Sequence, residues 1–504
     1  MDEEKNKTPP STTARNISWN YFGHFCQLAL NFGLTSFVVR RLSVPEYGLY
    51  LFVIFLSTTL YLLDLGVSSV LVQAYVAALS SPEKNRLGEL LTTVISASAV
   101  IGAIGAVILL GVSLVLPGPF NIPREFVHEA SLIFVAAAGK ILFGFVSLAF
   151  EPLYQAANRF DRVNQIELAG SGLIFVCSVT VLSLGYGIAA LAAVQCAAGA
   201  VQLLLSFVFL RSVFSVRQLH LRHFRWSILK NLFSQSKWTF LNNTSAFFFE
   251  VFIWTILGSF GSMREAAIFG LASKMPNHLW FLVDRGAAVC LPLMSETALN
   301  NNIDRLRKIY LSAQRLVLGL VLPFIVLGSI FAYPLIQIWA GKAYAASALV
   351  MQWLLLSVLG HAFLYTSDLL LYAAGHYRKA ALISASGSII TIAVALILVP
   401  RYGAAGMAFS MAVVQLPIVC TWFTFEACKY ARISFGLLAS EMLRGLGLPT
   451  AILASGIWVV LVFRREISSL WLVLAGVAIG CCYFAAWGFR TALPLYRQAS
   501  ETPN

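Results

Sequence analysis

The stretch RRLSVPEYGLYLFVIFLSTTLYLLDLGVSSVLVQ, residues 40 to 73, enters an apolar run, about 48–78, that is long enough to cross a bilayer and has Asp64 near its centre. A carboxylate at mid-membrane depth costs roughly 2.5 to 3.5 kcal/mol, so it normally faces protein or water and indicates a function. If the stretch forms one helix, a polar stripe runs along one face, because offsets of three, four and seven residues align. The members of this stripe are Ser57, Tyr61, Asp64 and Ser68.

Composition indicates that the whole chain is a membrane protein. Of its 504 residues, 59% are apolar and 11% are charged, and the mean hydropathy is +0.80; these values lie outside the range of soluble globular chains. Apolar windows of about 20 residues, the length that spans the hydrocarbon core, can be placed about fourteen times. We therefore predict an all-α polytopic membrane protein. The 8 cysteines lack metal-ligand spacing, so no metal site is expected.

The basic residues predict the topology. With these windows, 23 of the 35 lysines and arginines fall on the side of the chain termini, 8 fall on the opposite side and 4 lie inside windows. Cytoplasmic loops carry the excess of lysine and arginine, so both termini are predicted to be cytoplasmic. The net charge of +13 is mostly explained by this asymmetry, and no nucleic-acid partner is expected.

Features of the first six windows recur about 216 to 220 residues later, a spacing that predicts a parallel repeat of two six-helix lobes. The pairs are Glu46 and Asp64 with Glu265 and Asp284, LYQAANRF at 153–160 with LYAAGHY at 371–377, and Tyr186-Gly187 with Tyr402-Gly403. The predicted parts are a cytoplasmic tail (1–15), an N-lobe (16–210), a basic, partly helical cytoplasmic linker (211–236), a C-lobe (237–428), an extra helix pair (429–489) and a second cytoplasmic tail (490–504). Inside the two apolar windows of the extra pair, 445–463 and 469–489, ionisable residues are absent, so the pair is expected to pack peripherally.

Polar residues at helical spacing fall on the first, second and fourth windows of each lobe. Because unpaired charges avoid lipid, we predict that these stripes line one water-filled cavity. The candidate substrate-binding residues are Asn20, His24, Asp64, Lys140, Lys274, His278, Arg285 and Arg315. The candidate coupling or charge-balancing residues are Asp64, Glu250, Asp284, His361 and Asp368.

Each of these residue types also has a structural explanation. Amides and serines commonly hold membrane helices together, buried charges form ion pairs, and histidines sit in cores with satisfied hydrogen bonds. The four cations inside windows suit a phosphate-bearing or acidic substrate. The carboxylates either neutralise those cations or carry the H+ or Na+ of a coupled cycle, and no other cofactor is expected. The glycine-rich region from Gly102 to Gly111 lies inside a window, where close helix packing explains it.

The chain resembles the Wzx-like polysaccharide flippases, the PST branch of the multidrug/oligosaccharidyl-lipid/polysaccharide (MOP) exporter superfamily. The resemblance rests on the span count, the two lobes, RLSVPEYG at 41–48, Asp64-Leu65-Gly66, residues 155–160 and the two Tyr-Gly pairs. Ser43 stands where the family often has glycine. The resemblance implies translocation of an undecaprenyl-pyrophosphate-linked oligosaccharide across the bacterial inner membrane, for surface polysaccharide biosynthesis, by alternating access and with a cationic lumen.

Two other functions remain open. A cation-coupled drug or metabolite antiporter of the same superfamily would share the fold, whereas several cations in the cavity favour an anionic glycolipid. A membrane glycosyltransferase or polysaccharide polymerase usually needs a sizeable loop or domain outside the membrane, and the predicted periplasmic loops are short. We therefore expect no enzyme activity. The expected partners are the bilayer, the lipid-linked oligosaccharide and other polysaccharide-assembly proteins.

Overall fold

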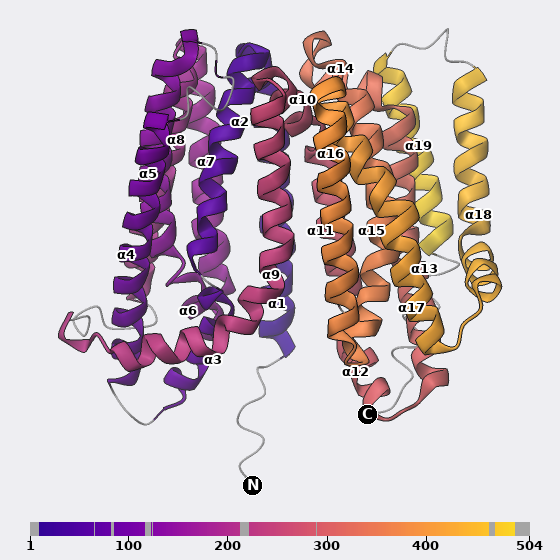
Figure 1. Ribbon diagram of the computed structural model, residues 1–504, viewed down its shortest axis with the longest axis horizontal. Coiled ribbons are helices and arrows are strands. Elements are labelled where there is room, and N and C mark those ends of the chain that lie inside the picture. Colours follow the sequence, from indigo (N-terminus) through magenta and orange to yellow (C-terminus); the bar gives the residue numbers. More distant parts are fainter. Residues whose placement is uncertain are drawn as a thin grey trace. The chain divides into compact units, whose positions relative to one another are not determined.

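The computed structural model of the chain is helical throughout its described elements (Figure 1). It describes the backbone of residues 10–488 except 65, 82–84, 116–121, 123, 212–220, 289 and 463–468. It does not describe the side chains of residues 10–25, 69, 124, 221, 237–250, 285, 286, 288, 292, 377 and 469. Within the described residues, 10 segments are long and apolar enough to cross a membrane, and one of them, Arg378–Ala431, covers two predicted windows. The prediction of an all-α polytopic membrane protein is confirmed.

Contacts divide the chain into two compact units, Met1–Arg264 and Glu265–Asn504. This division counts the seventh window with the first unit, whereas the repeat places it at the start of the C-lobe. The main helices of the first unit are α1 (Pro10–Arg41), α2 (Val44–Thr59), α3 (Val67–Leu79), α4 (Arg86–Val115), α5 (Val127–Ser147), α6 (Glu151–Ala156), α7 (Phe160–Ser183), α8 (Ile188–Leu210) and α9 (Trp226–Phe260).

Helix α5 is the centre of the first unit, because it packs against α4, α8 and α2, while α1 packs on α7. Glycines permit the closest of these approaches. A Cβ added at Gly102 of α4 would lie 3.2 Å from the Leu142 carbonyl oxygen, and one at Gly105 would lie 3.1 Å from Ile141. The packing role expected of this glycine-rich region is confirmed for these two positions.

Helix α9 begins inside the predicted linker. The helix starts at Trp226 and continues to Phe260, so 226–236 belongs to the same helix as the seventh window. Its early turns lie against α3 and its later turns run beside α2 (Figure 1). Arg225, just before the helix, donates to the Glu89 carboxylate of α4 at 2.9 Å, and its amide donates to the Thr93 hydroxyl at 3.0 Å. These bonds fix the entry of α9 onto the first unit.

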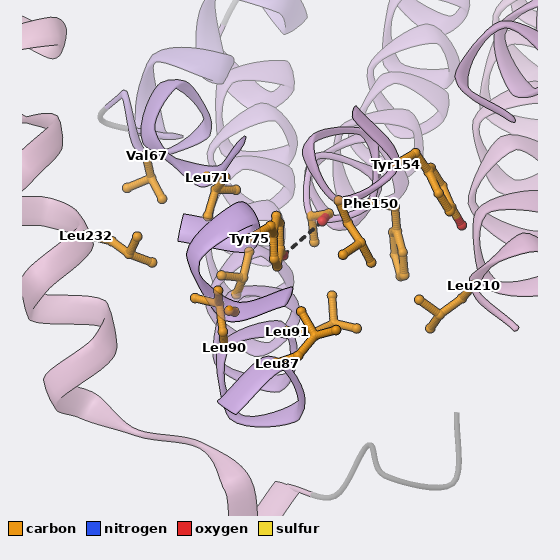
Figure 2. Close-up of a cluster of buried hydrophobic side chains, with 14 residues drawn as sticks. Val67, Leu71, Tyr75, Leu87, Leu90, Leu91, Phe150, Tyr154, Leu210 and Leu232 are labelled. Atoms are coloured by element: carbon orange, nitrogen blue, oxygen red, sulfur yellow. Dashed lines mark hydrogen bonds between the residues drawn. The ribbon is translucent and has the colours of Figure 1, made fainter. Parts of the chain in front are cut away.

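A buried hydrophobic cluster joins α3, α4 and α6 with the ends of α8 and α9 (Figure 2). Its tyrosines carry hydroxyl groups that must find hydrogen-bond partners when buried. The Tyr75 hydroxyl donates to the Ala149 carbonyl at 3.0 Å, and the Tyr154 hydroxyl donates to the Ser206 carbonyl. Tyr154 comes from the repeated LYQAANRF motif, so one role of that motif is structural.

The second unit is built around α15 (Ser347–Ala373), which contacts most of its neighbours. The other helices are α10 (Met263–Ala272), α11 (Lys274–Ala288), α12 (Leu291–Leu299), α13 (Ile303–Ile330), α14 (Ala332–Ala340), α16 (Tyr377–Val414), the π-helix η7 (Gln415–Cys420), α17 (Thr421–Ala431), α18 (Phe435–Val462) and α19 (Ser469–Trp487). Gly360 of α15 lies directly against η7, where an added Cβ would be 3.1 Å from the Leu416 Cα atom.

The repeat is visible in two turns that have the same hydrogen-bond geometry. Asn158 and Gly375, which are 217 residues apart, both have positive φ, 55° and 77°. In the first unit the Arg159 amide donates to the Tyr154 carbonyl at 2.8 Å, and in the second the His376 amide donates to the Leu371 carbonyl at 2.8 Å. A helix that ends in a left-handed residue with this long bond forms a Schellman-type cap. The two copies of the motif therefore fold alike.

Three windows predicted as single helices are interrupted. The second window becomes α2, a short 3-10 helix η2 (Leu60–Asp64) and α3; the fourth becomes α5 and α6; and the eighth becomes α10, α11 and α12. Residues on the two sides of an interruption lose their common helical phase. The prediction that Ser68 continues the Asp64 stripe is wrong for this reason.

Candidate functional site

Asp64 lies at the interruption between η2 and α3. Gly66 there has φ of 74°, a left-handed conformation that glycine adopts at little cost. The Asp64 carboxylate accepts a hydrogen bond from the Ser68 amide at 3.0 Å, at the first turn of α3. A carboxylate at a helix N-terminus satisfies an otherwise free N–H and interacts favourably with the helix dipole. Asp64 therefore has a capping role within the first unit.

Lys140 of α5 belongs to a polar chain inside the first unit. Its ammonium group donates to the Gln195 side-chain oxygen of α8 at 3.0 Å, and the Gln195 amide nitrogen donates to the Tyr50 hydroxyl of α2 at 3.2 Å. The three helices are thus joined through one cation. Gln195 and Tyr50 were not predicted; an amide in the middle of the apolar sixth window was the signal for Gln195.

A small pocket opens beside Lys140. It is lined mainly by apolar side chains, together with Ser57, Thr58, Tyr61, Lys140 and Gln195. The Ser57 and Thr58 hydroxyls donate to carbonyls of their own helix at 2.6 and 2.8 Å. The Lys140 ammonium group has three N–H donors and uses one of them on Gln195, so it can also donate to an anion or to water in the pocket. Lys140 thus lines a pocket within the first unit, and its place in a central cavity stays a prediction.

Tyr61 of η2 fixes the contact between η2 and α5. Its hydroxyl occupies the space above Gly144, where a side chain would collide with it. Its ring stacks on Phe145, with centroids 5.1 Å apart and an interplanar angle of 28°. Tyr61 therefore packs along α5 next to the Lys140 pocket.

In the second unit, Asp284 of α11 and His361 of α15 form a direct pair. Nε2 of His361 lies 2.7 Å from the Asp284 carboxylate, and the two side chains are 12% and 44% exposed, respectively. Trp280, one turn before Asp284, stacks on the imidazole with centroids 4.6 Å apart and an angle of 7°. The Tyr365 ring also lies beside the imidazole, with ring centroids 5.5 Å apart and an interplanar angle of 36°. Two of the predicted coupling residues are thus brought together, and Trp280 is an addition.

Neutral polar groups also join α15 to α13, at positions that follow His361 along α15. The Tyr310 and Ser367 hydroxyls are 3.0 Å apart, and Thr366 donates to the Gln314 side chain. All four side chains are fully buried. Asp368, the third predicted coupling residue on this side, lies two turns after His361 on α15.

The remaining predicted cations separate into two groups. Lys274 is the first residue of α11 and makes no ion pair with any side chain that the structure describes, and His278 lies one turn further along α11. Arg315 of α13 instead lies 3.5 Å from Glu441 of α18, in a pair whose side chains are 24% and 22% exposed. Arg315 therefore matches the ion-pair interpretation. The side chains of Asn20, His24, Glu250 and Arg285 lie outside the described residues.

The first helix of the extra pair is longer than its predicted window. The window 445–463 itself lacks charged residues, but α18 begins ten residues earlier and therefore includes Glu441 and Arg444. Glycines bring the pair close to the rest of the second unit: Gly319 of α13 faces Trp487 of α19, and Gly445 faces the Arg315 stem. The extra helix pair therefore contacts α13 through an ion pair as well as through apolar packing.

The long apolar helices, with charged side chains placed among them, define a polytopic membrane protein. The chain belongs to the family of polysaccharide biosynthesis proteins, whose family model matches residues 37–350. It is 24% identical over 345 residues to the uncharacterized membrane protein EpsK of Bacillus subtilis (strain 168), a match that covers 66% of each chain.

Solved structures share the fold. The lipid II flippase MurJ, in an inward closed conformation, superposes with a TM-score of 0.70 at 15% identity and covers 94% of this chain and 99% of its own. An inward-facing multidrug resistance MATE transporter of the MOP superfamily also has a TM-score of 0.70 at 15% identity, covering 81% and 94%. The resemblance to the Wzx-like branch of this superfamily is confirmed at the level of family and fold.

Proposed function

We propose that the protein is a flippase that carries an undecaprenyl-pyrophosphate-linked oligosaccharide from the cytoplasmic to the periplasmic leaflet by alternating access. The observation that carries this proposal is the family match over residues 37–350, because the family description is polysaccharide biosynthesis. The fold shared with a lipid II flippase adds support. The proposal is transport without chemical change to the glycan, in the bacterial inner membrane with both termini cytoplasmic, beside other polysaccharide-assembly proteins.

The charge distribution of the described residues supports an anionic substrate. Lys140 in the first unit and Lys274 in the second lie within helical bundles, and neither has a carboxylate partner among the described side chains. An unneutralised ammonium group inside a membrane protein is costly and therefore indicates a function. The pyrophosphate of a lipid carrier is a ligand that such groups bind through charge-assisted hydrogen bonds.

A cation-coupled antiporter is the second candidate. The MATE transporter has the same TM-score as the flippase, so the fold does not separate the two functions. The acid–base pair Asp284–His361 is a group that a coupled transporter of either kind can use. The two functions differ in substrate, and only one of them predicts that a lipid-linked glycan accumulates when the protein is absent.

Deleting the gene should trap lipid-linked oligosaccharide in the cytoplasmic leaflet, and the wild-type protein should cure this accumulation. Lys140→Gln should restore export at most about a tenth as well, because a lost bond to a charged group costs roughly 1.5 kcal/mol or more. Lys140→Arg keeps the charge and should retain more activity. Leaflet location is measured by the access of a membrane-impermeant lectin to the glycan in intact spheroplasts.

The control is Lys342→Gln, which removes an exposed cation and should complement like wild type. Each variant is first checked for expression and membrane insertion. If no lipid-linked glycan accumulates in the deletion strain and its sensitivity to cationic drugs rises, the antiporter function replaces the flippase.

A further inference from the structure

The second unit holds its interrupted eighth window to α15 by an acid–base pair. The Nε2 atom of His361 lies 2.7 Å from the carboxylate of Asp284, four residues before the end of α11 at Ala288. Trp280 and Asp284 are four residues apart on α11, so one helix face supplies both the ring that stacks on the imidazole and the carboxylate that binds it. Two side chains of α11 therefore contact the imidazole, beside Tyr365 of α15.

The first unit has a different contact at the corresponding place. The spacing of 217 residues between Asn158 and Gly375 aligns His361 with Gly144. Gly144 is covered by Tyr61, a residue of the interrupted second window. The contact between η2 and α5 thus uses a phenol ring, whereas the contact between α11 and α15 uses an imidazole, the side-chain type whose ordinary pKa lies nearest neutral pH. The two contacts at corresponding places therefore differ in chemistry.

The groups that face His361 are few among the described residues. Asp284 and Trp280 approach from α11. Lys274 and His278 lie on the same helix, at least one and a half turns before Asp284. Tyr365 and Asp368 lie on α15 itself. From α13 the neighbouring side chains are Tyr310 and Gln314, which are hydrogen-bonded within the interface. From η7 the backbone of Leu416 packs on Gly360. Two carboxylates, those of Asp284 and Asp368, therefore interact with His361.

We propose that the Asp284–His361 pair is the proton-loading site of the transport cycle, and that its protonation sets how firmly α11 is held on α15. This inference rests on the proposed transport function. In both states Nε2–H of His361 donates to the Asp284 carboxylate. The proton that is taken up and released resides on Nδ1, so loading converts a bond between a neutral group and an anion into an ion pair. Imidazole nitrogen and a single carboxylate suit a proton better than Na+, which prefers several oxygen ligands.

The test uses purified protein in liposomes with a fluorescent undecaprenyl-pyrophosphate-linked disaccharide as the probe. For wild type, the translocation rate should change roughly tenfold when the pH inside the liposomes is lowered from about 8 to about 6, the range in which histidine side chains titrate. His361→Gln keeps a donor for Asp284 but binds no proton, so its rate should vary less than about twofold over the same range. His376→Gln, which removes another histidine near the end of α15, is the matched control and should behave like wild type.

A second readout does not depend on transport. A protonated imidazole quenches an indole stacked on it, so the fluorescence of Trp280 should fall on acidification in wild type. The Trp280 fluorescence is obtained by subtracting the spectrum of the Trp280→Phe variant from that of wild type. The decrease of this fluorescence on acidification should be absent in His361→Gln. If wild type translocates the probe but His361→Gln keeps both responses to pH, the proton site is elsewhere. If wild type fails to translocate the probe at any pH, the proposed function itself is wrong.

Discussion

Replacing Gly144 with alanine should displace Tyr61 and destabilise the first unit by about 1 to 3 kcal/mol, the usual cost of overpacking a close contact. The added Cβ would collide with the Tyr61 hydroxyl, while the next ring atom lies at 3.1 Å. Tyr61 has little freedom to move away, because it also stacks on Phe145. The measurement is the midpoint of thermal unfolding of the purified protein in detergent.

Tyr61→Phe removes the colliding atom and provides the decisive partner variant. The single change should cost well under 1 kcal/mol, and in the double variant it should recover most of the stability lost by Gly144→Ala. Gly172→Ala is the control, because nothing lies within 4 Å of a Cβ at that position. Additive effects of the two substitutions would contradict the contact, since residues that touch should show a coupling energy.

Replacing Glu441 with alanine should destabilise the second unit by about 3 kcal/mol, because it leaves the Arg315 guanidinium without its carboxylate. The pair joins α13 to α18 at 3.5 Å, and both side chains are mostly buried. The same truncation at Glu426 is the matched control. That residue pairs with Lys379, whose side chain is 53% exposed, so its loss should cost at most about 1 kcal/mol.

An apolar replacement of both partners tests the physical cause. Arg315→Met together with Glu441→Leu should restore most of the stability, because no charge then remains buried without a partner. Thermal unfolding in detergent again measures the effect. Equal losses for Glu441→Ala and Glu426→Ala would show that the fastening of α18 depends on apolar packing, for example of Gly445 on the Arg315 stem, rather than on the ion pair.

Hydropathy predicted where helices lie but not where they break. The window that contains Asp64 is apolar on both sides of Gly66, so a scale that averages over about 20 residues cannot detect a single residue with φ of 74°. The helical-phase argument then extended the stripe to Ser68, beyond the point where the phase is lost. The sequence pair Asp64-Leu65-Gly66 held the relevant signal, because aspartate and glycine together are typical of a chain turn followed by a helix start.

The repeat was predictable because it depends on local chemistry. Asn158 and Gly375 are the two residue types that best tolerate a left-handed helix end, and both copies form the same cap. Contacts between residues far apart in the sequence were harder to predict. The sequence suggested Asp284 and His361 as members of one functional group, but it did not indicate that Trp280 stacks on His361 or that Arg315 pairs with Glu441.

The most direct test of the flippase account is translocation by the purified protein alone. Liposomes that contain the protein and a fluorescent undecaprenyl-pyrophosphate-linked disaccharide, confined at the start to the inner leaflet, are treated with a membrane-impermeant lectin. The account predicts that lectin-accessible probe rises with time in these liposomes and stays at its initial level with heat-inactivated protein. The account would be contradicted if lectin-accessible probe rose slowly and equally in both samples while the protein in the untreated sample was folded and inserted.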